Sequence, residues 1–109
     1  VQRYDVVCIG RVGVDIYPMQ IGVPLEEVTT FGKFLGGSAA NVAVAAARYG
    51  HSSTLITRTG NDPFGRFVRL KLAELGVPTE HVGTDKWLPD LEMLKGPAQE
   101  CGALRVLVP

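Results

Sequence analysis

The chain has 109 residues, 46% hydrophobic and only 7% aromatic, a composition typical of one small α/β domain. Eleven basic and eleven acidic residues give a formal net charge of +0, which argues against nucleic acid and membrane surfaces as partners. Without a secretory h-region or an apolar run long enough to span a bilayer, we expect a cytoplasmic protein. Cys8 and Cys101 form neither a disulfide framework nor a metal motif, and Cys8 is expected in the core.

The first predicted element is a strand over residues 4–9, an apolar and β-branched run that ends at Gly10. No G-x-G-x-x-G turn follows, which argues against a dinucleotide-binding site. Asp15 comes just past this strand, at the edge where open α/β sheets bind ligands. It either forms a turn by bonding to nearby backbone or accepts hydrogen bonds from two neighbouring hydroxyl groups of a sugar. Short strands are expected at 28–31 and 33–35.

The next stretch joins a pair of glycines to an alanine-rich helix. Gly36 and Gly37 can take backbone angles closed to other residues, and they let a ligand approach the main chain. We expect Ser38 to cap a helix over 38–49, and Asn41 in its first turn to point back over the glycines. The turn, the positive helix end and the amide predict a site for an oxygen-rich ligand. The alternative is a glycine turn before a tightly packed helix.

A second strand and a second helix complete the alternation. Residues 53–58 should pair in parallel with the first strand, with the alanine-rich helix crossing between them. Asp62 as N-cap and Pro63 at the first helical position predict where the second helix begins. One apolar face of this helix is expected in the core: Phe64, Phe67, Val68, Leu72 and Leu75.

The pattern from Gly36 to Gly60 resembles the N-terminal signature of the ribokinase-like (PfkB) carbohydrate kinases: a Gly-Gly, an Asn a few residues on, then glycines at set intervals. The resemblance covers residues 4–85 and implies the N-terminal part of a three-layer α/β/α fold with a parallel central sheet. Within that segment, 17–35 would cross to a small β lid. Residues 8–15 and 21–25 are most similar to the bacterial 5-dehydro-2-deoxygluconokinases of inositol breakdown. The substrate-binding residues implied by the resemblance are Asp15, Gly36, Gly37, Ser38 and Asn41.

The resemblance also implies an activity, which is ATP-dependent phosphorylation of a hydroxyl on a sugar or keto-deoxy sugar acid. The complete enzyme would use ATP and Mg²⁺ and would form a homodimer through the lid. In these kinases a Gly-Ala-Gly-Asp motif supplies the catalytic base, and the 109 residues lack it. We therefore expect no catalytic, cofactor-binding or metal-binding residue in this segment, and no activity from the chain alone.

Residues 86–109 do not resemble the lid strands that should come next, so they form an unassigned tail. Two other functions stay open beside the sugar kinase. One is a non-catalytic module that binds a polyol or assists assembly. The other is a nucleoside kinase of the same superfamily, for which Tyr17 is the only nearby aromatic residue that could line a base.

Overall fold

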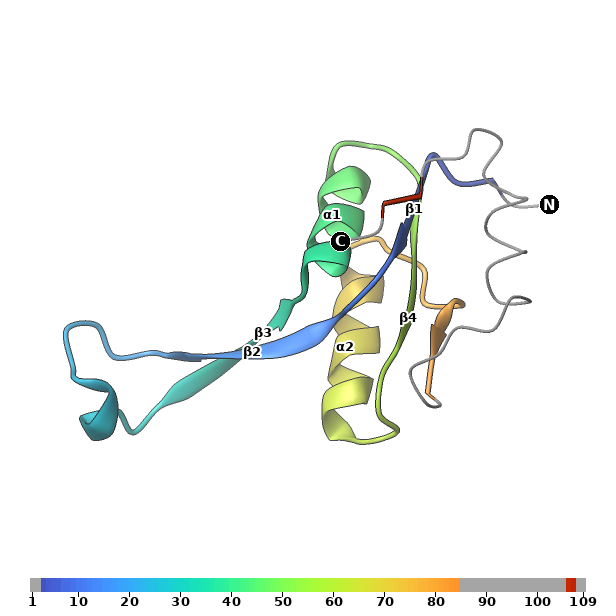
Figure 1. Ribbon diagram of the computed structural model, residues 1–109. Coiled ribbons are helices and arrows are strands. Elements are labelled where there is room, and N and C mark those ends of the chain that lie inside the picture. The colour runs from blue at the N-terminus through green and yellow to red at the C-terminus, as the bar shows by residue number, and fades with distance from the viewer. Residues whose placement is uncertain (1–2, 85–105, 108–109) are drawn as a thin grey trace.

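The computed structural model describes residues 3–84 and 106–107, which form a central sheet, a separate two-stranded ribbon and two α-helices (Figure 1). The central sheet has the order β5-β4-β1-β6, and each neighbouring pair is parallel. Its strands are β1 (Val6–Ile9), β4 (Ser53–Arg58), β5 (Val82–Gly83) and β6 (Val106–Leu107). The predicted parallel pairing of the first two central strands is confirmed. The tail at 86–109 lies outside the described residues, apart from 106–107 in β6.

Helices α1 (Ser38–Arg48) and α2 (Pro63–Glu74) share one core with one face of this sheet. Three alanines of α1 are buried there beside Cys8, and small side chains let a helix approach the strands closely. Burial raises the pKa of the Cys8 thiol to about 11, so the side chain is a neutral core residue, as predicted. A second cluster of Tyr4, Val7 and Ile56 occupies the other face. No helix in the described part of the chain is long and apolar enough to cross a membrane.

The ribbon consists of β2 (Gly13–Pro18) and β3 (Phe31–Gly36), paired antiparallel, and it projects away from the helices and the central sheet (Figure 1). It starts at Gly13, earlier than the excursion expected at 17–35. The strand expected at 28–31 was wrong for residues 28–30. There the N–H groups of Thr29 and Thr30 donate to Oε1 of Gln20, at 2.7 and 3.3 Å. The Gln20 side chain thus satisfies backbone groups that a strand would pair, and a 3₁₀ helix (Leu25–Glu27) forms the tip.

The helix boundaries follow local hydrogen bonding. Asp62 caps α2 as predicted, because its Oδ1 accepts from the Gly65 N–H at 2.8 Å. The prediction for Ser38 was wrong, since Gly37 is the N-cap of α1 and Ser38 is the first helical residue. The Gly37 carbonyl accepts the first helical bond, from the Asn41 N–H at 2.9 Å. Because glycine has no side chain, no side-chain hydrogen bond caps the start of α1.

Asp5 joins the amino ends of β1 and β4, opposite the edge that carries the ribbon. Its Oδ2 accepts from the Ser52 N–H at 3.0 Å and lies 3.6 Å from Nδ1 of His51. The backbone hydrogen bond from Ser52 is the main cause that lowers the pKa of Asp5 below its usual 3.8.

We expect Asp5→Ala to lower the free energy of unfolding at pH 7, with a smaller difference from the wild type at pH 3. The folded pKa lies below the unfolded one, so this stabilisation is present above about pH 4 and is lost as the pH falls through the folded pKa. Urea unfolding at both pH values measures the effect, with the exposed Glu74→Ala as control. An equal loss at both pH values would contradict it.

Candidate functional site

The two faces of the ribbon carry different side chains, because neighbouring residues of a strand point to opposite sides. Opposite residues of paired strands share a face, and the pairing includes Asp15 with Phe34 and Val14 with Leu35. We call the first side the Asp15 face, made of Gly13, Asp15, Tyr17, Gly32, Phe34 and Gly36. The second is the Val14 face, made of Val14, Ile16, Pro18, Phe31, Lys33 and Leu35.

On the Asp15 face, the structure brings Asp15 and Gly36 together. A Cβ atom built on Gly36 would collide with the carboxyl group of Asp15, so this side chain lies directly over Gly36. Asp15 is half-buried within β2, so it is not the turn residue of the alternative interpretation. Its Oδ2 lies 3.5 Å from the Tyr17 hydroxyl, at the outer limit of a hydrogen bond.

Gly37 holds the start of α1 against the connection between β1 and β2. Its φ of +97° is unfavourable for other residues, and a Cβ there would collide with the carbonyl oxygen of Arg11 and lie 2.9 Å from Cα of Val12. Ser38 and Asn41 follow in the first helical turn, and both are exposed. The five predicted site residues thus gather around one turn, which joins the base of the ribbon to α1.

The convergence of Asp15, Gly37 and Asn41 on one pocket stays a prediction. Within residues 3–84, the structure pairs the Asn41 N–H with Gly37, but it gives the Asn41 amide no hydrogen bond to Asp15. Amide nitrogens at the start of a helix have no intrahelical partner, and the glycines leave them accessible. This part of the chain can therefore offer a carboxylate and backbone donors to a hydroxylated ligand, which is binding chemistry rather than catalysis.

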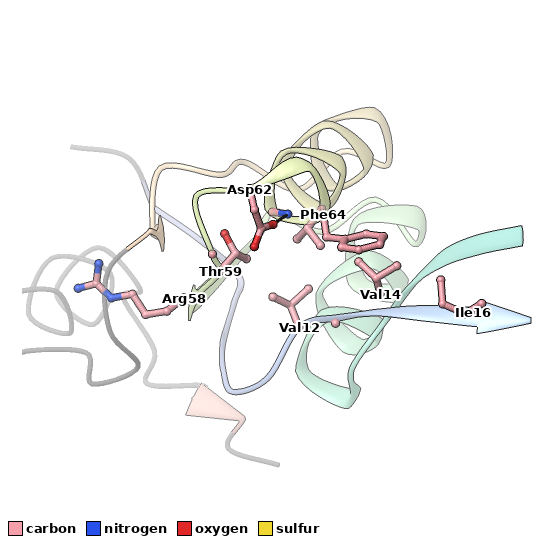
Figure 2. Close-up of a pocket in the computed structure, with 11 residues that line it drawn as sticks. Val12, Val14, Ile16, Arg58, Thr59, Asp62 and Phe64 are labelled. Carbon is pink, nitrogen blue, oxygen red and sulfur yellow. Dashed lines mark hydrogen bonds between the residues drawn. The ribbon is translucent and has the colours of Figure 1, made fainter.

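A cavity of about 390 Å³ lies elsewhere, between β2, the end of β4 and the start of α2 (Figure 2). Figure 2 shows Val12, Val14 and Ile16 along one side of it, with Phe64 and Asp62 at the start of α2. None of the five predicted residues lines this cavity. Strand alternation is the reason, because it turns Asp15 to the face opposite Val14.

Two polar side chains that line the cavity form hydrogen bonds within the protein. Asp62 caps α2, and Oγ1 of Thr59 lies 3.4 Å from a guanidinium nitrogen of Arg69. Phe64 is 55% exposed and lines the cavity, so the prediction of a core residue was wrong there, whereas Val68 and Leu72 are buried as predicted. Phe64 is the second residue of α2 and lines the cavity together with Val12 and Val14. The alternation of Val12, Val14 and Ile16 in the sequence could have indicated this apolar wall.

Metal ligation has no support in the described part of the chain, where no three His, Cys, Asp or Glu residues are grouped so that they could hold an ion.

On the Val14 face, Lys33 places its Nζ 4.7 Å from the ring centroid of Phe67. This cation–π contact attaches the ribbon to α2.

The fold and the glycine turn define a class of protein, the ribokinase-like α/β proteins. The model of the pfkB family carbohydrate kinases matches residues 3–92, and the chain belongs to this family. The 5-dehydro-2-deoxygluconokinase of Geobacillus thermodenitrificans is 42% identical over 82 residues, which are 75% of this chain and 24% of that protein. The enzyme of the same name from Lacticaseibacillus casei is 36% identical over 84 residues, 77% of this chain and 26% of that protein. The chain thus spans about a quarter of the length of these curated relatives.

Solved structures show the same relationship. A sugar kinase from Pyrococcus horikoshii, in complex with ATP, superposes with a TM-score of 0.68 at 37% identity, over 74% of this chain and 26% of that one. The fructokinase of Halothermothrix orenii gives a TM-score of 0.65 at 33% identity, over 75% of this chain and 30% of that one. The resemblance seen in the sequence is confirmed, as is the ribokinase-like α/β class with its parallel central sheet.

Proposed function

We propose that this chain is the sugar-binding part of an ATP-dependent kinase that phosphorylates a hydroxyl group, with 5-dehydro-2-deoxygluconate as the first candidate substrate. The observation that carries the proposal is the packing of the Asp15 carboxyl group against Gly36, beside the backbone of the turn into α1. A carboxylate can accept hydrogen bonds from two neighbouring hydroxyl groups. The backbone N–H groups at the start of a helix can donate hydrogen bonds to electron-rich oxygens. The names of the curated relatives supply the candidate substrate.

ATP would supply the phosphoryl group, and the ATP complex of the Pyrococcus horikoshii relative supports its use. Phosphoryl transfer also needs Mg²⁺, a base or positioning group and donors for the transferred phosphate. We assign none of these to the described residues, whose part is to bind and orient the acceptor sugar. Because ATP is supplied in the cytoplasm, we place the complete enzyme there, within inositol breakdown if the candidate substrate is correct.

We further propose that the ribbon acts as a lid over the sugar and pairs with the ribbon of a second copy. Its tip exposes large apolar side chains: Met19 at 57%, Ile21 at 100% and Leu25 at 66%. Exposed apolar patches and free strand edges on a projecting ribbon commonly mark interaction surfaces. The partner expected is the same chain in a homodimer.

The function is tested by measuring ADP release with ATP, Mg²⁺ and a panel of sugars and keto-deoxy sugar acids. We expect the complete protein that contains this sequence to turn over at ordinary kinase rates, roughly 1–100 per second. The 109-residue chain by itself should stay at background, because it lacks the Gly-Ala-Gly-Asp motif. Turnover by the chain alone would contradict the division of roles. Sugar binding without turnover by the complete protein would favour the non-catalytic module.

A further inference from the structure

The Asp15 face carries an aromatic pair next to its carboxylate. The rings of Tyr17 and Phe34 have centroids 5.6 Å apart and are tilted by 59°. Both side chains remain open to solvent, with 53% of Tyr17 and 44% of Phe34 exposed. Large aromatic side chains normally bury most of their surface, so a contacting pair half open to solvent is available to a ligand.

The glycines of this face leave room for the side chains beside them, because a Cβ on Gly32 would meet Met19 and Phe34 and one on Gly36 would meet Asp15. Three of its six positions are glycine: Gly13, Gly32 and Gly36. The Phe34 ring lies over Gly32, since a Cβ there would come within 2.9 Å of the ring. Asp15 lies over Gly36, toward the base of the ribbon. The carboxylate therefore faces the glycine turn, and the aromatic pair stands on the side toward the ribbon tip.

We propose that Tyr17 and Phe34 form an aromatic wall against which the carbon-bound hydrogens of the sugar pack while Asp15 holds its hydroxyl groups. This inference rests on the proposed function and adds two residues that determine specificity. A sugar presents polar hydroxyls and apolar C–H patches, so its site needs a few polar groups beside apolar, often aromatic, surface. The Asp15 face provides both within one ribbon. The wall selects ligands with a C–H face over small charged ones.

The test uses the complete kinase, with KM and kcat measured for its best sugar. Phe34→Ala and Tyr17→Ala should each raise KM on the order of tenfold with little change in kcat, because they remove contact area but no reacting group. Tyr17→Phe should stay close to the wild type, since it keeps the ring. Phe31→Ala is the matched control, because Phe31 lies on the same strand at 49% exposure but on the Val14 face. Its KM should change less than twofold.

Calorimetric titration of each variant with the sugar, and light scattering to follow its oligomeric state, separate the possible outcomes. Equal increases of KM in Phe34→Ala and Phe31→Ala, or a changed oligomeric state of Phe34→Ala at unchanged KM, would overturn the aromatic wall and leave the kinase assignment intact. Faster phosphorylation of adenosine than of any sugar would assign the wall to a nucleoside base and overturn the sugar-binding role. A wild type that neither binds nor phosphorylates a sugar would overturn the proposed function and the wall together.

Discussion

Asp15→Ala is expected to weaken sugar binding by the complete kinase about tenfold to hundredfold. Hydrogen bonds that involve a charged group contribute about 1.5–3 kcal/mol, which corresponds to this range of affinity. The carboxyl group lies against Gly36 within a paired strand, so little ordering is needed when the sugar binds. Asp15→Asn should fall between the wild type and Asp15→Ala, because an amide keeps one acceptor and loses the charge.

Calorimetric titration with the sugar measures this loss, and Asp5→Ala is the matched control. Asp5 is also an aspartate, but it lies at the amino ends of the strands, where it bonds to Ser52. Its replacement should lower stability at pH 7 and leave sugar affinity unchanged. Unchanged affinity in Asp15→Ala would remove this carboxylate from the binding site and with it the observation on which the proposed function rests.

Gly37→Ala is expected to destabilise the protein by about 3 kcal/mol or more, the largest stability effect of any substitution discussed here. Two causes add. A φ of +97° with a ψ of 132° costs an alanine about 1–3 kcal/mol, and its Cβ would collide with the Arg11 carbonyl oxygen, a backbone atom that cannot swing aside. The turn between the ribbon and α1 would have to open.

Gly50→Ala separates these two causes. Gly50 also has a positive φ, +86°, but nothing lies within 4 Å of a Cβ built there. Its replacement should therefore cost only the conformational part, about 1–2 kcal/mol. Urea unfolding of both variants measures the difference. Equal losses would mean that the close approach of Arg11 to Gly37 is relieved without cost.

Local patterns in the sequence predicted much of the fold. The β-branched runs predicted β1 and β4, and the residues between them predicted the helical crossover. Asp62 and Pro63 predicted the start of α2, because an N-cap and a first-turn proline act within a few residues of their own position. The glycine and asparagine spacing was specific enough to indicate the carbohydrate kinase family, which the family match over residues 3–92 confirms.

Ser38 and Phe64 show where local patterns failed. Serine is a good N-cap in general, but the turn at Gly37 moved the boundary by one residue. Phe64 fits the apolar period of α2, yet it lines the cavity at the helix start and is 55% exposed. Periodicity defines a face of a helix, whereas the position of the neighbouring elements decides how much of that face is buried.

The sequence by itself therefore determined the family, the order of β1, α1, β4 and α2, and the residue types that a sugar site needs, but it did not predict β2. The tertiary structure decided which of them meet. Asp15 contacts Gly36 across the ribbon, Gly37 contacts the Arg11 backbone, and Tyr17 and Phe34 share a face with Asp15 rather than with Val14. The positions of Phe34 and Gly36 beside Asp15 depend on the register between the two strands, and a shift of one residue would have placed both on the face opposite Asp15.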